Sequence, residues 1–148
     1  MELDPIDVQI LQILSKNARI QWKDLGKRIH MTGQAVGNRI KKLEDNGIIT
    51  SYTLLLDEMK LGLSFTAFVI MYMNSANHQP FIRFINERKE IIEVHRISGK
   101  GCYHLMIKIT SQEELNHLLN QLLKHGNYNL NLSIHQVKKQ HPLTAYNK

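Results

Sequence analysis

Hydrophobic residues recur at helical spacing close to the N-terminus. Ile6, Ile10 and Ile13 follow one another at intervals of four and three residues, which is the period of one face of an α-helix. Asp4 suits the N-cap of this helix, and Pro5 suits its first position because proline has no N–H to leave unpaired. The pattern predicts a first helix that begins at Pro5.

A second hydrophobic stripe predicts a short helix over about residues 22–29. Trp22, Leu25 and Ile29 lie on one face of this helix. A tight break is expected directly after it, at residues 30–31.

The third stripe consists of Val36, Ile40 and Leu43. Thr32 can cap this helix, and Gly47 follows its end with a residue that readily adopts a left-handed backbone. The short helix, the tight turn and this third helix together predict a helix-turn-helix.

After the third helix the sequence changes character. Residues 48–57 are rich in β-branched and aromatic side chains, which predicts a strand that forms a wing beside the helices. We expect a winged helix-turn-helix domain over residues 1–50, a wing strand and linker over 51–63, and a second domain over 64–148.

The second domain has six predicted elements in the order strand, helix, strand, strand, helix, strand. This βαββαβ order is typical of the ferredoxin-like fold, in which both helices cover one face of a single sheet. The chain is therefore predicted to be an α+β protein. The elements are expected at residues 66–73, 79–88, 91–97, 102–109, 112–124 and 129–138.

Charge adds a functional direction to this outline. The chain has 148 residues and a formal net charge of +6, and a basic excess favours a polyanionic partner. A charged stretch is often only a solvated face, so the charge matters here because it coincides with the helix-turn-helix. Eight basic residues stand against the single acid Asp24 in this region: Lys16, Arg19, Lys23, Lys27, Arg28, Arg39, Lys41 and Lys42.

Several classes of protein are not expected. One cysteine, Cys102, cannot form an intramolecular disulfide. No signal-peptide pattern is present, and the longest apolar stretch, residues 65–73, is far shorter than the roughly 20 residues that span a bilayer. We expect a reduced, cytoplasmic protein associated with the nucleoid and not with a membrane.

The outward face of the third predicted helix has chemistry suited to the major groove of DNA. Gln34, Asn38 and Lys41 gather opposite the hydrophobic stripe. Glutamine and asparagine can bond adenine edges, and lysine can bond guanine. Arg39 and Lys42 lie on the flanks and suit phosphates. A merely solvated helix face is the simpler alternative.

Gly37 lies inside this helix, where glycine costs about 1 kcal/mol relative to alanine. Two explanations are open: a close approach to the second helix or another neighbour, and a helix that lies near a DNA backbone.

Several segments match a known family in both identity and spacing: Leu3-Asp4-Pro5-Ile6-Asp7, Ala18-Arg19-Ile20, Asp24-Leu25-Gly26, Val36-Gly37-Asn38-Arg39-Ile40 and Leu43-Glu44-Asp45-Asn46-Gly47-Ile48-Ile49. Through them the chain resembles the Lrp/AsnC (leucine-responsive, feast/famine) family of bacterial and archaeal transcription regulators over nearly its whole length. The resemblance implies that Arg39 lies at the DNA interface. Thr32 and Gly33 replace the Ser-Pro pair that often starts the family's recognition helix, so the cap is retained and the proline is lost.

The same resemblance implies that the second domain binds a ligand and forms oligomers, with amino acids held between subunits near the turn that joins the middle strands. Lys100 and Cys102 stand where the family commonly has acidic residues. Either a carboxylate meets Lys100, or the site is vestigial. The implied effector residues are Ser98, Gly99, Lys100, Gly101, Cys102 and Tyr103.

Strand alternation predicts which side chains of the middle strands pack on the helices. The opposite, partly apolar face is a plausible subunit interface. We expect a homodimer, with a higher homo-oligomer such as an octamer as an option. The helix side is expected to contain Ile91, Ile97, Tyr103, Leu105, Ile107 and Ile109, and the open side Val94, Arg96, Cys102, His104 and Met106.

No metal, cofactor or enzymatic activity is expected. His95 and His104 are predicted to point to opposite faces without an acidic cluster. No nucleophile and base pair, metal set or phosphate loop is present, and Cys102 is interpreted as a buried or interface thiol.

The leading hypothesis is a regulator of transcription whose dimer places two recognition helices in successive major grooves of double-stranded DNA. An amino-acid effector would change its assembly or geometry. The alternative hypothesis is an architectural protein that bends or wraps DNA with little effector control.

Overall fold

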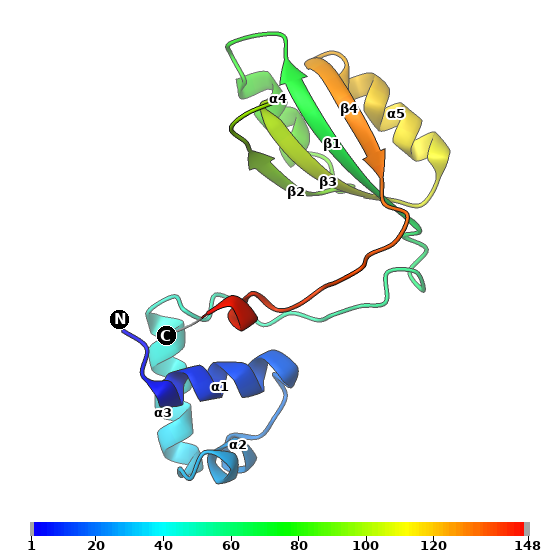
Figure 1. Cartoon of the computed structure of the whole chain (residues 1–148). Helices are drawn as coiled ribbons and strands as arrows, with labels where there is room; N and C mark the ends of the chain where they lie inside the picture. The colour runs from blue at the N-terminus through cyan, green and yellow to red at the C-terminus, as the bar shows by residue number, and fades with distance from the viewer. Residues whose placement is uncertain (1, 147–148) are drawn as a thin grey trace. The chain divides into compact units, whose positions relative to one another are not determined.

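The computed structural model describes residues 2–146, which form two compact units. One unit contains the residues up to Leu55 together with the segment from Lys138, and the other runs from Leu56 to Val137. The C-terminal segment, with the short 3-10 helix η1 (Pro142–Ala145), therefore groups with the N-terminal helices, and η1 contacts the first of them (Figure 1).

The N-terminal unit contains three helices, α1 (Pro5–Lys16), α2 (Trp22–Arg28) and α3 (Gly33–Asp45). The first turn of α1 is closed by a reciprocal cap, because the Asp7 N–H donates to Asp4 (2.8 Å) and the Asp4 N–H donates to Asp7 (3.2 Å). The expected stripes point inward and form one core, except that Trp22 of the second stripe is 54% exposed and takes no part in it. Its buried members are Ile10, Leu14, Leu25, Val36, Ile40 and Leu43.

The turn between α2 and α3 is a Schellman motif. His30 adopts a left-handed backbone (φ 57°), and the Met31 N–H donates to the Gly26 carbonyl at 2.8 Å. A Cβ at Gly26 would lie 2.4 Å from the Met31 carbonyl oxygen. Glycine is thus required at position 26 for the chain to turn this tightly into α3.

The predicted wing strand over residues 48–57 is wrong, since the structure assigns no strand there. A strand needs a neighbour for its backbone hydrogen bonds, and these residues have no ladder partner in the described chain. Leu54 and Leu55 are 75% and 86% exposed. The Tyr52 hydroxyl donates to Glu44 at 2.8 Å, and burial together with Glu44 raises the pKa of Tyr52 to about 12.

The second unit confirms the ferredoxin-like prediction. Its four strands form an antiparallel sheet in the order β2-β3-β1-β4. Both helices cover one face, where Phe81 of α4 and the leucines of α5 pack against alternate residues of β1 and β3 (Figure 1). The elements are β1 (Phe65–Met73), α4 (Gln79–Asn86), β2 (Ile91–Arg96), β3 (Tyr103–Ile109), α5 (Gln112–Leu122) and β4 (Gly126–Leu132).

A β-bulge in β2 corrects part of the predicted face assignment. The pairing with β3 changes register between Ile91 and Glu93, so that Val94 lies opposite Leu105 and packs against the core. The extra residue shifts the alternation of the strand. The expectation that Val94 lies on the open face is therefore wrong.

Arg96 and Cys102 also differ from the predicted open face. Arg96 lies opposite Tyr103, whose side chain is in the core, and directly paired residues project to the same side of a sheet. Cys102 precedes β3, is half-buried and packs against the core. His104 and Met106 remain on the open side as expected, and His104 stacks on Phe68 with ring centroids 5.7 Å apart.

The two strand histidines lie closer than expected. His95 is directly opposite His104 in the ladder, so they share a face, and the prediction of opposite faces is wrong for the same reason, the bulge. His95 bonds Glu93 of its own strand. No group of three or more His, Cys, Asp or Glu side chains within residues 2–146 is arranged to hold a metal ion.

Candidate DNA-binding surface and effector site

The outward face of α3 presents two amides side by side. Gln34 and Asn38 are both exposed, and Gln34 Nε2 donates to Asn38 Oδ1 at 3.3 Å. Lys41 is exposed one turn further along the same stripe. These three side chains take no part in the hydrophobic core, so they are available to contact base edges.

Thr32 and Lys42 lie at opposite ends of α3. The Thr32 hydroxyl accepts a hydrogen bond from the Ala35 N–H (3.2 Å), so it is engaged as the N-cap of the helix. Lys42 is exposed in the last turn. Thr32 thus positions the helix, while Lys42 is free to meet an anion.

Arg39 is half-buried and forms ion pairs with two carboxylates. Its Nη1 lies 2.6 Å from Asp4 Oδ2 and 2.7 Å from Asp7 Oδ1, and the Asp7 side chain is only 4% exposed. The Asp7 N–H and the Arg39 guanidinium hold the pKa of Asp4 below its ordinary value, and Asp4 and Asp7 together raise the pKa of Arg39. These ion pairs link α3 to the start of α1. The guanidinium expected at the DNA interface is therefore already bound to two carboxylates of its own chain.

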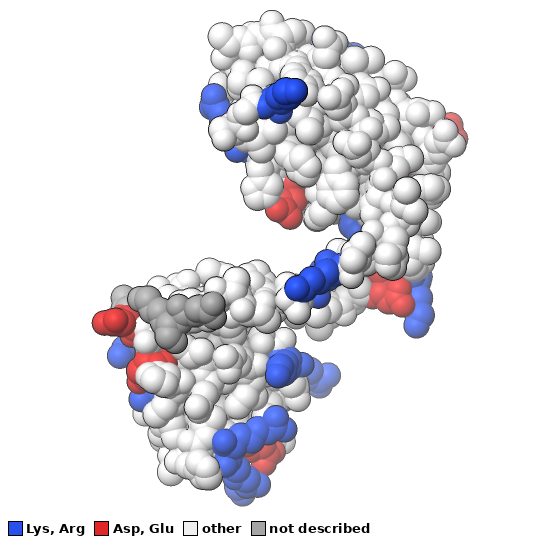
Figure 2. Space-filling model, viewed as in Figure 1, with Lys and Arg blue, Asp and Glu red and all other residues white. Residues whose placement is uncertain are grey.

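Several exposed side chains of α2 are basic. Lys23, Lys27 and Arg28 are exposed, and Lys27 pairs with Asp24 at 3.0 Å, which lowers the pKa of that carboxyl. Figure 2 shows Lys and Arg side chains gathered over the lower part of the N-terminal unit on the face it draws. The arrangement offers several cations to a polyanion.

The close approach at Gly37 identifies one reason for glycine at this position. A Cβ there would lie 2.7 Å from both Cε3 and Cζ3 of Trp22. Of the two explanations for Gly37, the structure shows contact with the second helix.

The predicted effector turn is exposed in its first half. Ser98, Gly99 and Lys100 are exposed, and Gly99 and Gly101 have φ values of 98° and 102°. A Cβ at Gly101 would lie 2.4 Å from Ile70 Cγ2. The turn therefore combines an open loop with a tightly packed return to the sheet.

The second half of the turn packs against the core. The Cys102 N–H donates to the Met71 carbonyl at 2.7 Å. Tyr103 is 5% exposed, its hydroxyl lies 2.9 Å from His78 Nδ1, and its ring packs on Phe81 with centroids 5.0 Å apart. Tyr103 and most of Cys102 are thus turned toward the helices and away from solvent.

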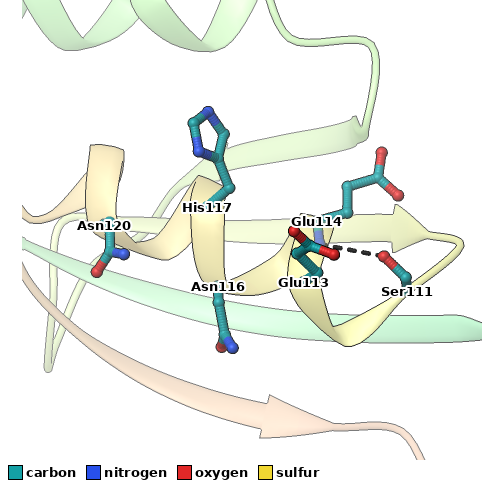
Figure 3. Close-up of a pocket in the computed structure, with 6 residues that line it drawn as sticks. All are labelled: Ser111, Glu113, Glu114, Asn116, His117 and Asn120. Atoms are coloured by element: carbon teal, nitrogen blue, oxygen red, sulfur yellow. Dashed lines mark hydrogen bonds between the residues drawn. The ribbon is translucent and has the colours of Figure 1, made fainter.

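A shallow hollow lies on the surface of α5. Figure 3 shows that its side chains diverge, with Asn116 and Asn120 on one side of the helix and Glu114 and His117 on the other. Ser111 caps the helix by accepting from the Glu114 N–H at 3.1 Å. Because the polar groups do not converge, this hollow has no geometry for ligand binding.

Comparison with protein families matches both units. Residues 3–44 match the AsnC-type helix-turn-helix domain, and residues 66–143 match the Lrp/AsnC ligand binding domain. No helix among residues 2–146 is both long and apolar enough to cross a membrane.

Known proteins are similar over almost the whole chain. The transcriptional regulator LrpB of Bacillus subtilis is 62% identical over 141 residues, 95% of each chain, and LrpA of the same species is 41% identical over 89% of this chain and 98% of its own. The structure of B. subtilis LrpC superposes with a TM-score of 0.89 at 30% identity, covering 95% of this chain and all of that one. A Neisseria meningitidis regulator, NMB0573 in complex with L-Met, has a TM-score of 0.88 at 26% identity, covering 93% and 94%.

Proposed function

Because the chain belongs to the Lrp/AsnC family of transcription regulators, we propose that it binds specific double-stranded DNA through the outer face of α3 and adjusts this binding to an amino acid or a related metabolite. It is a regulator with a helix-turn-helix DNA-binding domain and a ligand-binding domain, and it is not an enzyme. As a regulator of chromosomal genes it acts in the cytoplasm, at the nucleoid.

One observation carries the DNA proposal. Gln34 and Asn38 stand adjacent on the solvent face of α3 with no packing role, and side-chain amides bond adenine edges in the major groove. Lys41 adds a donor suited to guanine, and Lys42 a cation suited to phosphate. Thr32 contributes by capping and orienting the helix.

Selection from a randomised duplex pool tests this proposal. The protein should enrich a defined sequence, and Gln34→Ala should relax preference at one or two base positions. Lys60→Ala, an exposed lysine outside α3 paired with Asp57 at 3.6 Å, is the control and should retain the enriched sequence. Enrichment of no sequence would contradict specific readout.

The effector proposal rests on the exposed half of the 98–103 turn. Lys100 offers a cation to the carboxylate that all free amino acids share, and Ser98 and Gly99 lie beside it in the sequence. The L-Met complex of the Neisseria regulator supports an amino acid as the ligand class. Gly101, Cys102 and Tyr103 form the second half of the turn, which packs against the sheet and its core.

We also propose that the chain assembles as a homodimer or a higher oligomer such as an octamer through the open face of the sheet. Phe68, Ile70 and Met106 lie half-buried on that face, away from both helices. An apolar face of this kind is normally covered by a partner. Sedimentation at several concentrations should give a dimer or larger species, and a monomer at micromolar concentration would contradict it.

An architectural role that bends or wraps DNA without an effector is the second candidate. The observation that favours it is the turn itself, because Tyr103 and Cys102 pack against the core and are not open to a ligand from solvent. Titration of the common amino acids against DNA affinity and oligomer size separates the two. A change with any of them supports effector control, and no change with all of them supports the architectural role.

A further inference from the structure

Trp22 is the only tryptophan of the chain and the first residue of α2. It is 54% exposed, although its large indole would contribute strongly to a core if it were buried. The N-terminal core is built without it. A large aromatic side chain thus stands half in solvent at the junction of α2 and α3.

Two glycines of α3 form the surface on which Trp22 lies. A Cβ at Gly33 would be 3.1 Å from the Lys23 nitrogen, and a Cβ at Gly37 would be 2.7 Å from Trp22 Cε3 and Cζ3. Gly33 and Gly37 are four residues apart, so they lie on one row of the helix. The start of α2 therefore lies along this row, and the six-membered ring of Trp22 covers Gly37.

The contact at Gly37 shows which ring of the Trp22 indole packs against α3. Cε3 and Cζ3, the atoms nearest a Cβ at Gly37, belong to the six-membered ring, while Nε1 belongs to the five-membered ring of an indole. Trp22 Nε1 makes no hydrogen bond to any of residues 2–146. The indole N–H is only a donor, so it remains available to an acceptor outside the chain.

The row that supports Trp22 borders the amide stripe. Gln34 follows Gly33 and Asn38 follows Gly37, and consecutive residues of an α-helix are about 100° apart around the axis. The indole consequently lies next to the face proposed to enter the major groove. In helix-turn-helix proteins the helix before the recognition helix crosses the DNA backbone, and α2 is the helix before α3.

We propose that Trp22 contacts the DNA backbone, with its indole N–H donating to a phosphate beside the groove that α3 occupies and its exposed ring packing on the adjacent deoxyribose. The proposal rests on the proposed DNA-binding function. A backbone contact positions α3 on any duplex and carries no base preference of its own. The exposed Lys23 next to it supplies the cation for the same strand.

The protein's own fluorescence tests this proposal, because Trp22 is its sole tryptophan. The full chain is titrated with a duplex of random sequence at low salt while binding is followed independently by mobility shift. Acrylamide quenching of the tryptophan should fall when the duplex is saturating. Binding in the mobility shift with unchanged quenching would overturn the Trp22 contact and leave the proposed function intact. No binding to random or selected duplexes would overturn both.

Variants separate a DNA contact from a packing role. Trp22→Phe keeps an aromatic ring over Gly37 and loses the N–H, so the affinity for the random and the selected duplex should fall about fivefold with an unchanged Tm. Its salt slope should stay at the wild-type value because no charge is lost, whereas Lys23→Ala should lower the slope by about 1. Wild-type affinity of Trp22→Phe would overturn the proposal.

Discussion

The face of α3 and the turn at residues 98–103 are the two proposed functional surfaces, and they differ in how binding residues and core residues are arranged. On α3 the helical period places the core residues on one side and Gln34 and Asn38 on the other. In the turn, neighbouring residues alternate between solvent and core within a few positions, and Tyr103 packs against Phe81. A helix can change its outer face without loss of stability, whereas a tight turn changes binding and folding together.

The largest expected effect tests the turn as a folding element. Gly101→Ala should lower the free energy of unfolding by about 3 kcal/mol, because the new Cβ meets Ile70 Cγ2 at 2.4 Å and the backbone has a positive φ. Gly99→Ala is the matched control, since its φ is similar but its surroundings are open. Urea unfolding measures both, and equal losses would show that packing at Gly101 is unimportant.

The next effect concerns Arg39, a basic residue of α3 that takes part in folding. Arg39→Ala should destabilise the N-terminal unit by about 2 kcal/mol, because it leaves the buried Asp7 carboxylate without its cation. Below the Tm, the folded variant should keep the salt slope of DNA binding. Lys42→Ala should show the opposite result, with unchanged stability and a slope lower by about 1. A reduced slope for Arg39→Ala would restore a phosphate contact to this residue.

A smaller effect is expected on the functional face of α3. Asn38→Ala should lose about 1.5 kcal/mol of discrimination at one base position, with little change on random DNA or in Tm. Binding to a panel of single-base variants of the selected site measures this. Equal losses on selected and random duplexes would contradict base readout by Asn38.

The smallest expected effect is on the pH dependence of stability, through Asp4, the N-cap of α1. Since the pKa of Asp4 is lowered by the Asp7 N–H and Arg39, its contribution to stability is present above the ordinary carboxyl value of 3.8 and is lost as the pH falls through its lower folded value. The urea midpoint should decline over this acid range less in Asp4→Asn than in the wild type. Parallel declines would contradict the assignment.

Local patterns predicted much of this molecule. The caps Asp4 and Thr32 and the three hydrophobic stripes, apart from Trp22, are confirmed by the structure because each depends on residues within one or two turns. The βαββαβ order is confirmed for the same reason.

What the sequence did not predict depends on distant residues. The pairing of Arg39 with Asp4 spans 35 positions, and the bulge at Ile91 and Glu93 depends on how β3 aligns with β2. The wing strand failed because β propensity in residues 48–57 has no ladder partner in the described chain. The two acidic residues Asp4 and Asp7 at the start of α1 were the sequence feature that could have indicated an ion pair with a basic residue of α3.

The grouping of the C-terminal segment with the N-terminal helices determines the order in which the two units can be completed during synthesis on the ribosome. Helices α1 to α3 are synthesised first, but η1, which contacts α1, leaves the ribosome only after all of residues 56–137. The DNA-binding unit is therefore completed after the ligand-binding unit, although it is started before it. A nascent chain interrupted anywhere within the sheet would carry the amide stripe of α3 without this last contact on α1.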